Sequence, residues 1–94
     1  MRSLKQYKKI HLNDLKVGEW YKLTSKRFNV YIFKFSGFTD VRDCRYIGKS
    51  ESYCISSIIY GDYNAPYLCM DTEVEEIHRA KDSEVKLYFP DVEI

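Results

Sequence analysis

Residues 28–38 (FNVYIFKFSGF) constrain the fold of this chain more than any other stretch. Most of their side chains are aromatic or β-branched, the types that favour a pleated strand. Because successive side chains of a strand alternate between its faces, the stretch divides into two apolar sets. One set is Phe28, Val30 and Ile32, and the other is Tyr31, Phe33 and Phe35. A strand that is apolar on both faces must be covered on both, so these residues predict the central strand of a sheet.

Further strands are predicted at intervals of about ten residues, with turn-forming residues between them. In residues 41–49, the alternation favours Arg42, Cys44 and Tyr46 as the side chains that face the core. Glycines and polar residues predict turns at 37–40 and 48–52. This spacing predicts five or six antiparallel strands in a barrel or a sandwich. Besides the central strand, the predicted strands are residues 19–25, 41–49, 53–60, 67–70 and 84–89.

One short helix is predicted near residues 72–81. Thr72 and Glu75 stand three residues apart, as in a capping box, and acidic side chains crowd the expected N-terminus of the helix. Val74 and Ile77 would form a narrow apolar stripe that packs on the sheet. After this helix, residues 84–89 (EVKLYF) alternate between polar and apolar types, which predicts a strand with Val85, Leu87 and Phe89 facing inward.

The length of the chain limits it to one domain. Ninety-four residues can enclose one small hydrophobic core, so residues 1–94 are expected to fold as a unit. Residues 1–10 (MRSLKQYKKI) hold four basic side chains and predict either a short helix or a flexible basic arm.

Charge is divided unevenly along the chain. Residues 1–49 hold twelve lysines and arginines against four acidic residues, whereas residues 50–94 hold three against ten. This division predicts one of two arrangements. Either one face of the protein is positive, or strands from the two halves lie side by side and pair their charges.

The three cysteines, Cys44, Cys54 and Cys69, are separated by ten and fifteen positions. This spacing fits neither a disulfide framework nor the paired Cys-x₂-Cys pattern of zinc sites. Cys44 and Cys54 fall within predicted strands, so we expect reduced and mostly buried thiols. A zinc site that combines the three cysteines with His78 is the alternative.

The sequence contains no nucleophile elbow, no glycine-rich phosphate loop and no metal-spaced cluster of His, Asp and Glu. We therefore expect no enzymatic activity, no cofactor and no metal. It also contains no signal-peptide pattern, no lipidation signal and no apolar run long enough to cross a bilayer. These features predict a cytoplasmic protein that does not bind membranes.

The best candidate for a binding site is the segment 60–67 (YGDYNAPY), which proline stiffens. Its tyrosines offer rigid aromatic area, a property of recognition loops. Rings beside cations suit single-stranded nucleic acid or a nucleotide, and Tyr and Arg also supply the strongest contacts of protein interfaces. Alternatively, these tyrosines fill one end of the fold and bind nothing. The candidate residues are Tyr60, Tyr63 and Tyr67 in the segment, with Tyr53, Arg42, Arg45 and Lys49 from neighbouring strands.

Residues 15–22 (LKVGEWYK) and 30–35 (VYIFKF) resemble a recurrent pattern in small uncharacterised bacteriophage proteins. Those proteins run L-K-V-G-x-W-Y-K, then Y-I-x-K-F, and later have an acidic helix, where this chain has residues 71–77. The resemblance implies an SH3-like barrel. It also implies a phage accessory protein, a class that often binds and blocks host machinery.

We therefore expect a mainly β domain, at the border of the α+β class, that acts by binding. The expected partner is a host protein, such as a defence factor, which this chain would inhibit. One alternative is a protein that binds single-stranded nucleic acid or a nucleotide signal. Another is a structural component of a virion, which would form stable homo-oligomers.

Overall fold

The computed structural model describes residues 8–56 and 67–93. Their elements, with η for a short 3₁₀ helix, are η1 (Leu12–Asp14), β1 (Trp20–Ser25), β2 (Val30–Val41), β3 (Cys44–Cys54), β4 (Tyr67–Met70), η2 (Asp71–Glu73), β5 (Val74–Arg79) and α1 (Asp82–Tyr88). The predicted mainly β class is confirmed.

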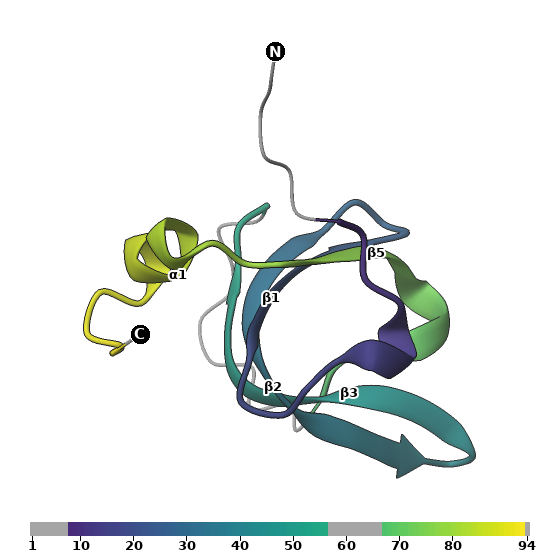
Figure 1. Ribbon diagram of the computed structural model, residues 1–94. Coiled ribbons are helices and arrows are strands. Elements are labelled where there is room, and N and C mark those ends of the chain that lie inside the picture. Colours follow the sequence, from purple (N-terminus) through teal and green to yellow (C-terminus); the bar gives the residue numbers. More distant parts are fainter. Residues whose placement is uncertain (1–7, 57–66, 94) are drawn as a thin grey trace.

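The strands form one antiparallel sheet in the order β4-β3-β2-β1-β5. β2 is the middle strand, as its two apolar faces predicted. β4 and β5 lie at opposite edges, yet only η2 separates them in the chain. Because a 3₁₀ helix rises about 2 Å per residue, the sheet must curve until its edges approach each other at this end. Figure 1 shows the strands wound around a common interior. In the described residues, however, no pairing joins β4 to β5.

Two hydrophobic cores lie on the two sides of the sheet. Phe33 and Phe35 belong to the first core, inside the curve, and Ile32 belongs to the second core, under α1. The predicted alternation of β2 is therefore confirmed for these residues. The other buried members of the first core are Tyr21, Leu23, Ile47, Cys69 and Ile77. Ala80 and Val85 complete the buried part of the second core, with Trp20, Ile55, Tyr88, Phe89 and Val92 packed against it.

Phe28 was predicted to share a strand face with Val30 and Ile32, and this is wrong. It lies in the turn between β1 and β2, with its φ at 65° and its side chain 81% exposed. Ser25 organises this turn, because its hydroxyl accepts hydrogen bonds from the N–H groups of Arg27 and Asn29 at 3.3 and 3.1 Å. The strand therefore begins only at Val30.

The turn predicted at residues 37–40 is also wrong, because β2 continues to Val41. Gly37, with a φ of 116°, lies where the pairing register of β2 and β3 shifts, and it permits a bulge within the strand. Gly48 lies against it, since a Cβ atom on Gly48 would come within 2.7 Å of the Gly37 carbonyl oxygen. The close approach of the two strands at this point depends on these glycines.

The turn that joins β2 to β3 consists of Arg42 and Asp43, whose φ values are 52° and 64°. Positive φ at both positions is the type I′ geometry, which fits the twist of a hairpin. Because Arg42 is in the turn, the predicted core face of Arg42, Cys44 and Tyr46 is wrong, and Ile47 is the residue that enters the core. The predicted loop at 48–52 is part of β3 instead, and residues 57–60 of the strand predicted at 53–60 lie outside the described residues.

The helix predicted at 72–81 is wrong, since residues 71–73 form η2 and residues 74–79 form β5. β5 pairs with β1, which sets Ile77 opposite Leu23 in the first core. The chain before η1 also reaches β5, because the Ile10 N–H donates to the Ile77 carbonyl at 2.7 Å. Thus the end of the predicted basic arm is tied to the sheet, while residues 1–7 lie outside the described part.

The strand predicted at 84–89 is wrong as well, because residues 82–88 form α1. Val85, Tyr88, Phe89 and Val92 follow the spacing of a helix face and all pack in the second core. Leu87, predicted to face inward, is 71% exposed. The Glu84 carboxylate accepts from the Lys81 N–H at 3.2 Å, which satisfies a backbone donor at the helix start. In the described ranges, no helix is long and apolar enough to cross a membrane.

The Asp43→Gly substitution should stabilise the β2–β3 turn. A left-handed backbone costs a residue with a Cβ atom about 1–2 kcal/mol, and glycine avoids most of this cost. The greater entropy of glycine in the unfolded chain offsets only part of that gain. We expect the free energy of unfolding to rise by about 0.5–1 kcal/mol in urea melts. Asp43→Val, whose branched side chain resists this conformation, should lower it. A gain with valine would contradict the assigned turn.

Val85→Ala and Leu87→Ala should differ sharply in stability. Val85 is only 1% exposed, so its truncation leaves a cavity under α1 and should cost about 2 kcal/mol. Leu87→Ala should change the free energy of unfolding by less than about 0.5 kcal/mol, since Leu87 faces solvent. Equal losses in urea melts would indicate a strand with both side chains inward, as the alternation of the sequence suggested.

Candidate functional site

Of the seven residues predicted to form a binding site, the five that the structure describes do not gather at one place. Tyr60 and Tyr63 lie outside the described residues. Tyr53 stacks on Tyr88 of α1, with ring centroids 4.7 Å apart, and so helps to hold the helix on the sheet. The remaining four, Arg42, Arg45, Lys49 and Tyr67, lie on β3, on β4 or in the turn before β3.

Residues 38–47 and 67–70 form a projecting ribbon that we call the hairpin ribbon; Figure 1 shows the hairpin part leaving the body of the sheet. Tyr67 packs on Tyr46 across β3 and β4, with ring centroids 4.7 Å apart and planes tilted by 34°. Because Ile47 is buried in the first core, the neighbouring Tyr46 points to the opposite face of the ribbon. One predicted residue, Tyr67, therefore belongs to an aromatic pair on this face.

The other face of the ribbon carries Arg45 in a fixed position. The Arg45 guanidinium lies 4.4 Å from the centre of the Phe38 ring, and its Nε donates to the Asp71 carboxylate at 2.9 Å. Phe38 in turn packs edge-on against Phe35 of the first core, at 5.1 Å. Arg45 was predicted, whereas Phe38 and Asp71 were missed because residues 37–40 were interpreted as a turn and residues 72–81 as a helix.

Ion pairs join the basic half of the chain to its acidic half. Lys22 of β1 pairs with Glu84 of α1 at 3.3 Å. This pattern supports the prediction that strands from the two halves lie side by side and pair their charges. The further pairs are Arg27–Glu73, Arg45–Asp71 and Arg79–Glu19.

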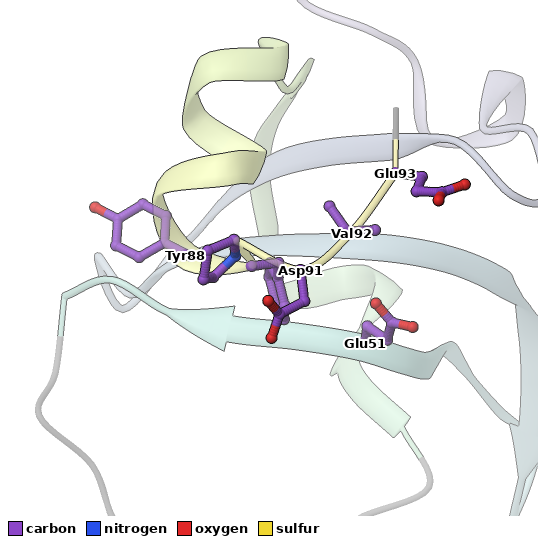
Figure 2. A pocket seen from close by; sticks show the side chains of 7 residues that line it. Glu51, Tyr88, Asp91, Val92 and Glu93 are labelled. Atoms are coloured by element: carbon purple, nitrogen blue, oxygen red, sulfur yellow. The ribbon is translucent and has the colours of Figure 1, made fainter.

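A hollow of about 530 Å³ lies between β3 and the segment that follows α1. We call it the C-terminal hollow. Figure 2 shows this segment crossing beside β3, with Glu51 on the strand and Asp91, Val92 and Glu93 on the segment. Its other lining residues are Tyr88, Phe89 and Pro90, so apolar side chains and three carboxylates line the hollow together. The sequence did not indicate this site, because residues 84–89 were predicted to be a strand.

A second hollow of about 350 Å³ lies where the N-terminal segment meets β1 and β5. Lys9 and Lys16 line it together with an Arg79–Glu19 ion pair of 2.8 Å. The Tyr21 hydroxyl at its base accepts from the Lys16 N–H at 2.8 Å. These contacts hold the N-terminal segment on the sheet. We therefore interpret the residues that line this hollow as structural.

Cys44, Cys54 and Cys69 are reduced thiols that form no disulfide. Burial in the first core, with smaller contributions from the nearby Glu73 and Asp71 carboxylates, raises the pKa of Cys69 to about 11. A thiol with such a pKa is almost wholly protonated at neutral pH, so Cys69 is the opposite of an activated nucleophile. Cys44 and Cys54, at the two ends of β3, are half-buried. In residues 8–56 and 67–93, no three His, Cys, Asp or Glu side chains are grouped to hold a metal.

The raised pKa of Cys69 predicts a loss of stability at high pH. The pKa of the unfolded thiol is near its ordinary value of 9.0, whereas the pKa of the folded thiol is about 11. The contribution of the protonated thiol to the free energy of unfolding is complete below pH 9. This contribution is lost as the pH rises through 11. Between pH 8 and 10.5, the stability advantage of wild type over Cys69→Ala should shrink by about 2 kcal/mol in urea melts. The stability advantage of wild type over Val85→Ala should stay constant with pH. If the advantage over Cys69→Ala were constant as well, the raised pKa of Cys69 would be contradicted.

No family model matches this chain, and neither does any curated protein or solved structure.

Proposed function

We propose that the described strands form an SH3-like small barrel that is open between β4 and β5. Two features support this barrel-like curvature of the sheet. The three-residue link η2 brings the two edge strands together at one end. The register shifts near Gly37 and Gly48 add the bends that a sheet needs to curl.

We further propose that this protein is a non-enzymatic binding protein of bacteriophage type, which inhibits a host protein by binding to it. The resemblance at residues 15–22 and 30–35 suggests the phage origin. Several residues of these segments, such as Tyr21 and Phe33, lie in the first core. The resemblance therefore bears on the fold, and the kind of partner must be inferred from the exposed side chains.

The observation that carries this proposal is the arrangement of Arg45 on the hairpin ribbon. Its guanidinium is fixed between the Phe38 ring and the Asp71 carboxylate, at 4.4 and 2.9 Å. Arginine and aromatic side chains dominate the binding energy of protein interfaces. A side chain already held in place loses little conformational entropy when a partner docks. Phe38, 36% exposed, offers the apolar part of this contact.

The charges near Arg45 favour a protein partner over a nucleic acid. Asp71 already compensates the Arg45 charge at 2.9 Å, and Asp40 is the partner of Arg45 in the β2–β3 register. Asp43 follows Arg42 in the turn. A phosphate backbone would approach three carboxylates together with the two arginines, so the ribbon lacks the uncompensated cations that dominate nucleic-acid binding.

The proposal is tested by capture from bacterial lysate on immobilised protein, with and without nuclease. We expect the same host protein to be retained in both cases, and its own activity to fall when this chain is added. Phe38→Ala should weaken the purified complex by about 2 kcal/mol, as an aromatic anchor does. Leu87→Ala, which removes exposed apolar area on α1, is the matched control and should bind as wild type does.

Salt dependence separates the two classes of partner. A protein complex anchored by Phe38 and a compensated arginine should weaken only slightly between low and moderate salt. Ligand loss after nuclease treatment, a steep log–log salt slope or normal binding by Phe38→Ala would each overturn the proposal. Thermal melts of the variants would exclude unfolding as the cause of weak binding.

A further inference from the structure

The turn between β1 and β2 exposes the aromatic ring of Phe28, which is outside both hydrophobic cores. Phe28 is 81% exposed, although its φ of 65° is a conformation that bulky residues avoid. In three-residue hairpin loops, glycine is favoured at such a left-handed position. A large aromatic side chain that is both strained and exposed therefore suggests a contact outside its own domain.

This turn is rigid, so the ring is held in place. The Ser25 hydroxyl accepts from two backbone N–H groups of the turn, and the Phe28 N–H donates to the Ser25 carbonyl at 2.9 Å. The Lys26 N–H donates to the Glu73 carbonyl at 2.8 Å, which ties the turn to η2. Lys26 and Arg27 precede the ring, and Arg27 remains 79% exposed despite an ion pair of 3.7 Å with Glu73.

The complementary surface is present on the same chain. The C-terminal hollow combines polar and apolar surface, with Phe89 and Val92 among its apolar residues and carboxylates at Glu51, Asp91 and Glu93. The hollow is open to solvent, and its volume of about 530 Å³ is larger than one phenyl ring. The two cations that precede the Phe28 ring and the three carboxylates of the hollow are complementary in charge.

The turn cannot reach the hollow of its own molecule. Ser52 is opposite Phe33 in the β2–β3 register, so Glu51 lies near the level of Lys34. Six residues of extended chain separate Phe28 from that level, a distance of roughly 20 Å. The turn is rigid, so only a second molecule can fill the hollow with this ring.

We propose that this protein self-associates, with Phe28 of one copy inserted into the C-terminal hollow of a second copy. Lys26 and Arg27 of the first copy then face Glu51, Asp91 and Glu93 of the second. Each copy has one such turn and one such hollow, so the contact is heterologous and can be repeated from copy to copy. This inference is independent of the proposed host partner, which uses the hairpin ribbon.

Sedimentation equilibrium of the purified chain tests this contact directly. Wild type should show an average mass above that of the monomer, rising with concentration and falling with added salt. Phe28→Gly removes the ring and relieves the backbone, so it should fold well and weaken the association at least tenfold. Glu51→Lys combined with Asp91→Lys, both at exposed positions, should have the same effect by repelling Lys26 and Arg27.

Mixing these two variants provides the decisive control. The Phe28→Gly chain keeps its hollow, and the double-lysine chain keeps its ring, so a mixture should form one-to-one heterodimers although each variant alone is monomeric. Monomeric wild type at all concentrations, undiminished association of Phe28→Gly, or no heterodimer in the mixture would each overturn the proposal. Phe28→Gly should still capture the host partner, so failure of one proposal is distinguishable from failure of the other.

Discussion

The three-residue link between the two edge strands is the constraint on which the rest of this structure depends. β4 and β5 are at opposite edges of the sheet, yet Asp71–Glu73 alone joins them. The sheet must therefore curve, and its concave side encloses the first core around Phe33 and Phe35. The convex side is left with an apolar surface at Ile32 and Trp20, which α1 covers. The position of the helix is thus a consequence of the curvature of the sheet.

Curvature also explains the glycines and the long hairpin. β2 and β3 are the longest strands, and they can follow the curve only where their register shifts. Gly37 provides a positive φ at one shift, and Gly48 provides the space for the Gly37 carbonyl. Beyond this point the two strands continue as the hairpin ribbon and leave the body of the sheet (Figure 1). This projection places Phe38 and Arg45 where a partner can contact them.

Part of the surface charge of the described residues is compensated, because the fold pairs the two halves of the chain. Ion pairs such as Lys22–Glu84 and Arg45–Asp71 join the basic half to the acidic half. Among the described residues, the exposed Phe28 ring and the acidic C-terminal hollow are two features that the fold does not explain. Both are consistent with a protein that works through contacts with other protein chains. Neither depends on the chemistry of a reactive side chain.

The sequence by itself determined the mainly β class, the central place of β2 and its two-sided burial, because alternation of apolar side chains is a local property. It also indicated Arg45 and Tyr67 as surface residues of interest. It did not determine whether residues 74–79 and 82–88 were strand or helix. Residues 82–88 fit either period, and in residues 74–79 the only apolar side chains, Val74 and Ile77, have the spacing of a helix. Pairing of Ile77 with Leu23 decided the earlier segment, and packing of Val85 in the second core decided the later one. The Phe38–Arg45–Asp71 cluster and the C-terminal hollow were also beyond prediction. Each combines residues from strands, turns and segments that only the curved sheet brings together.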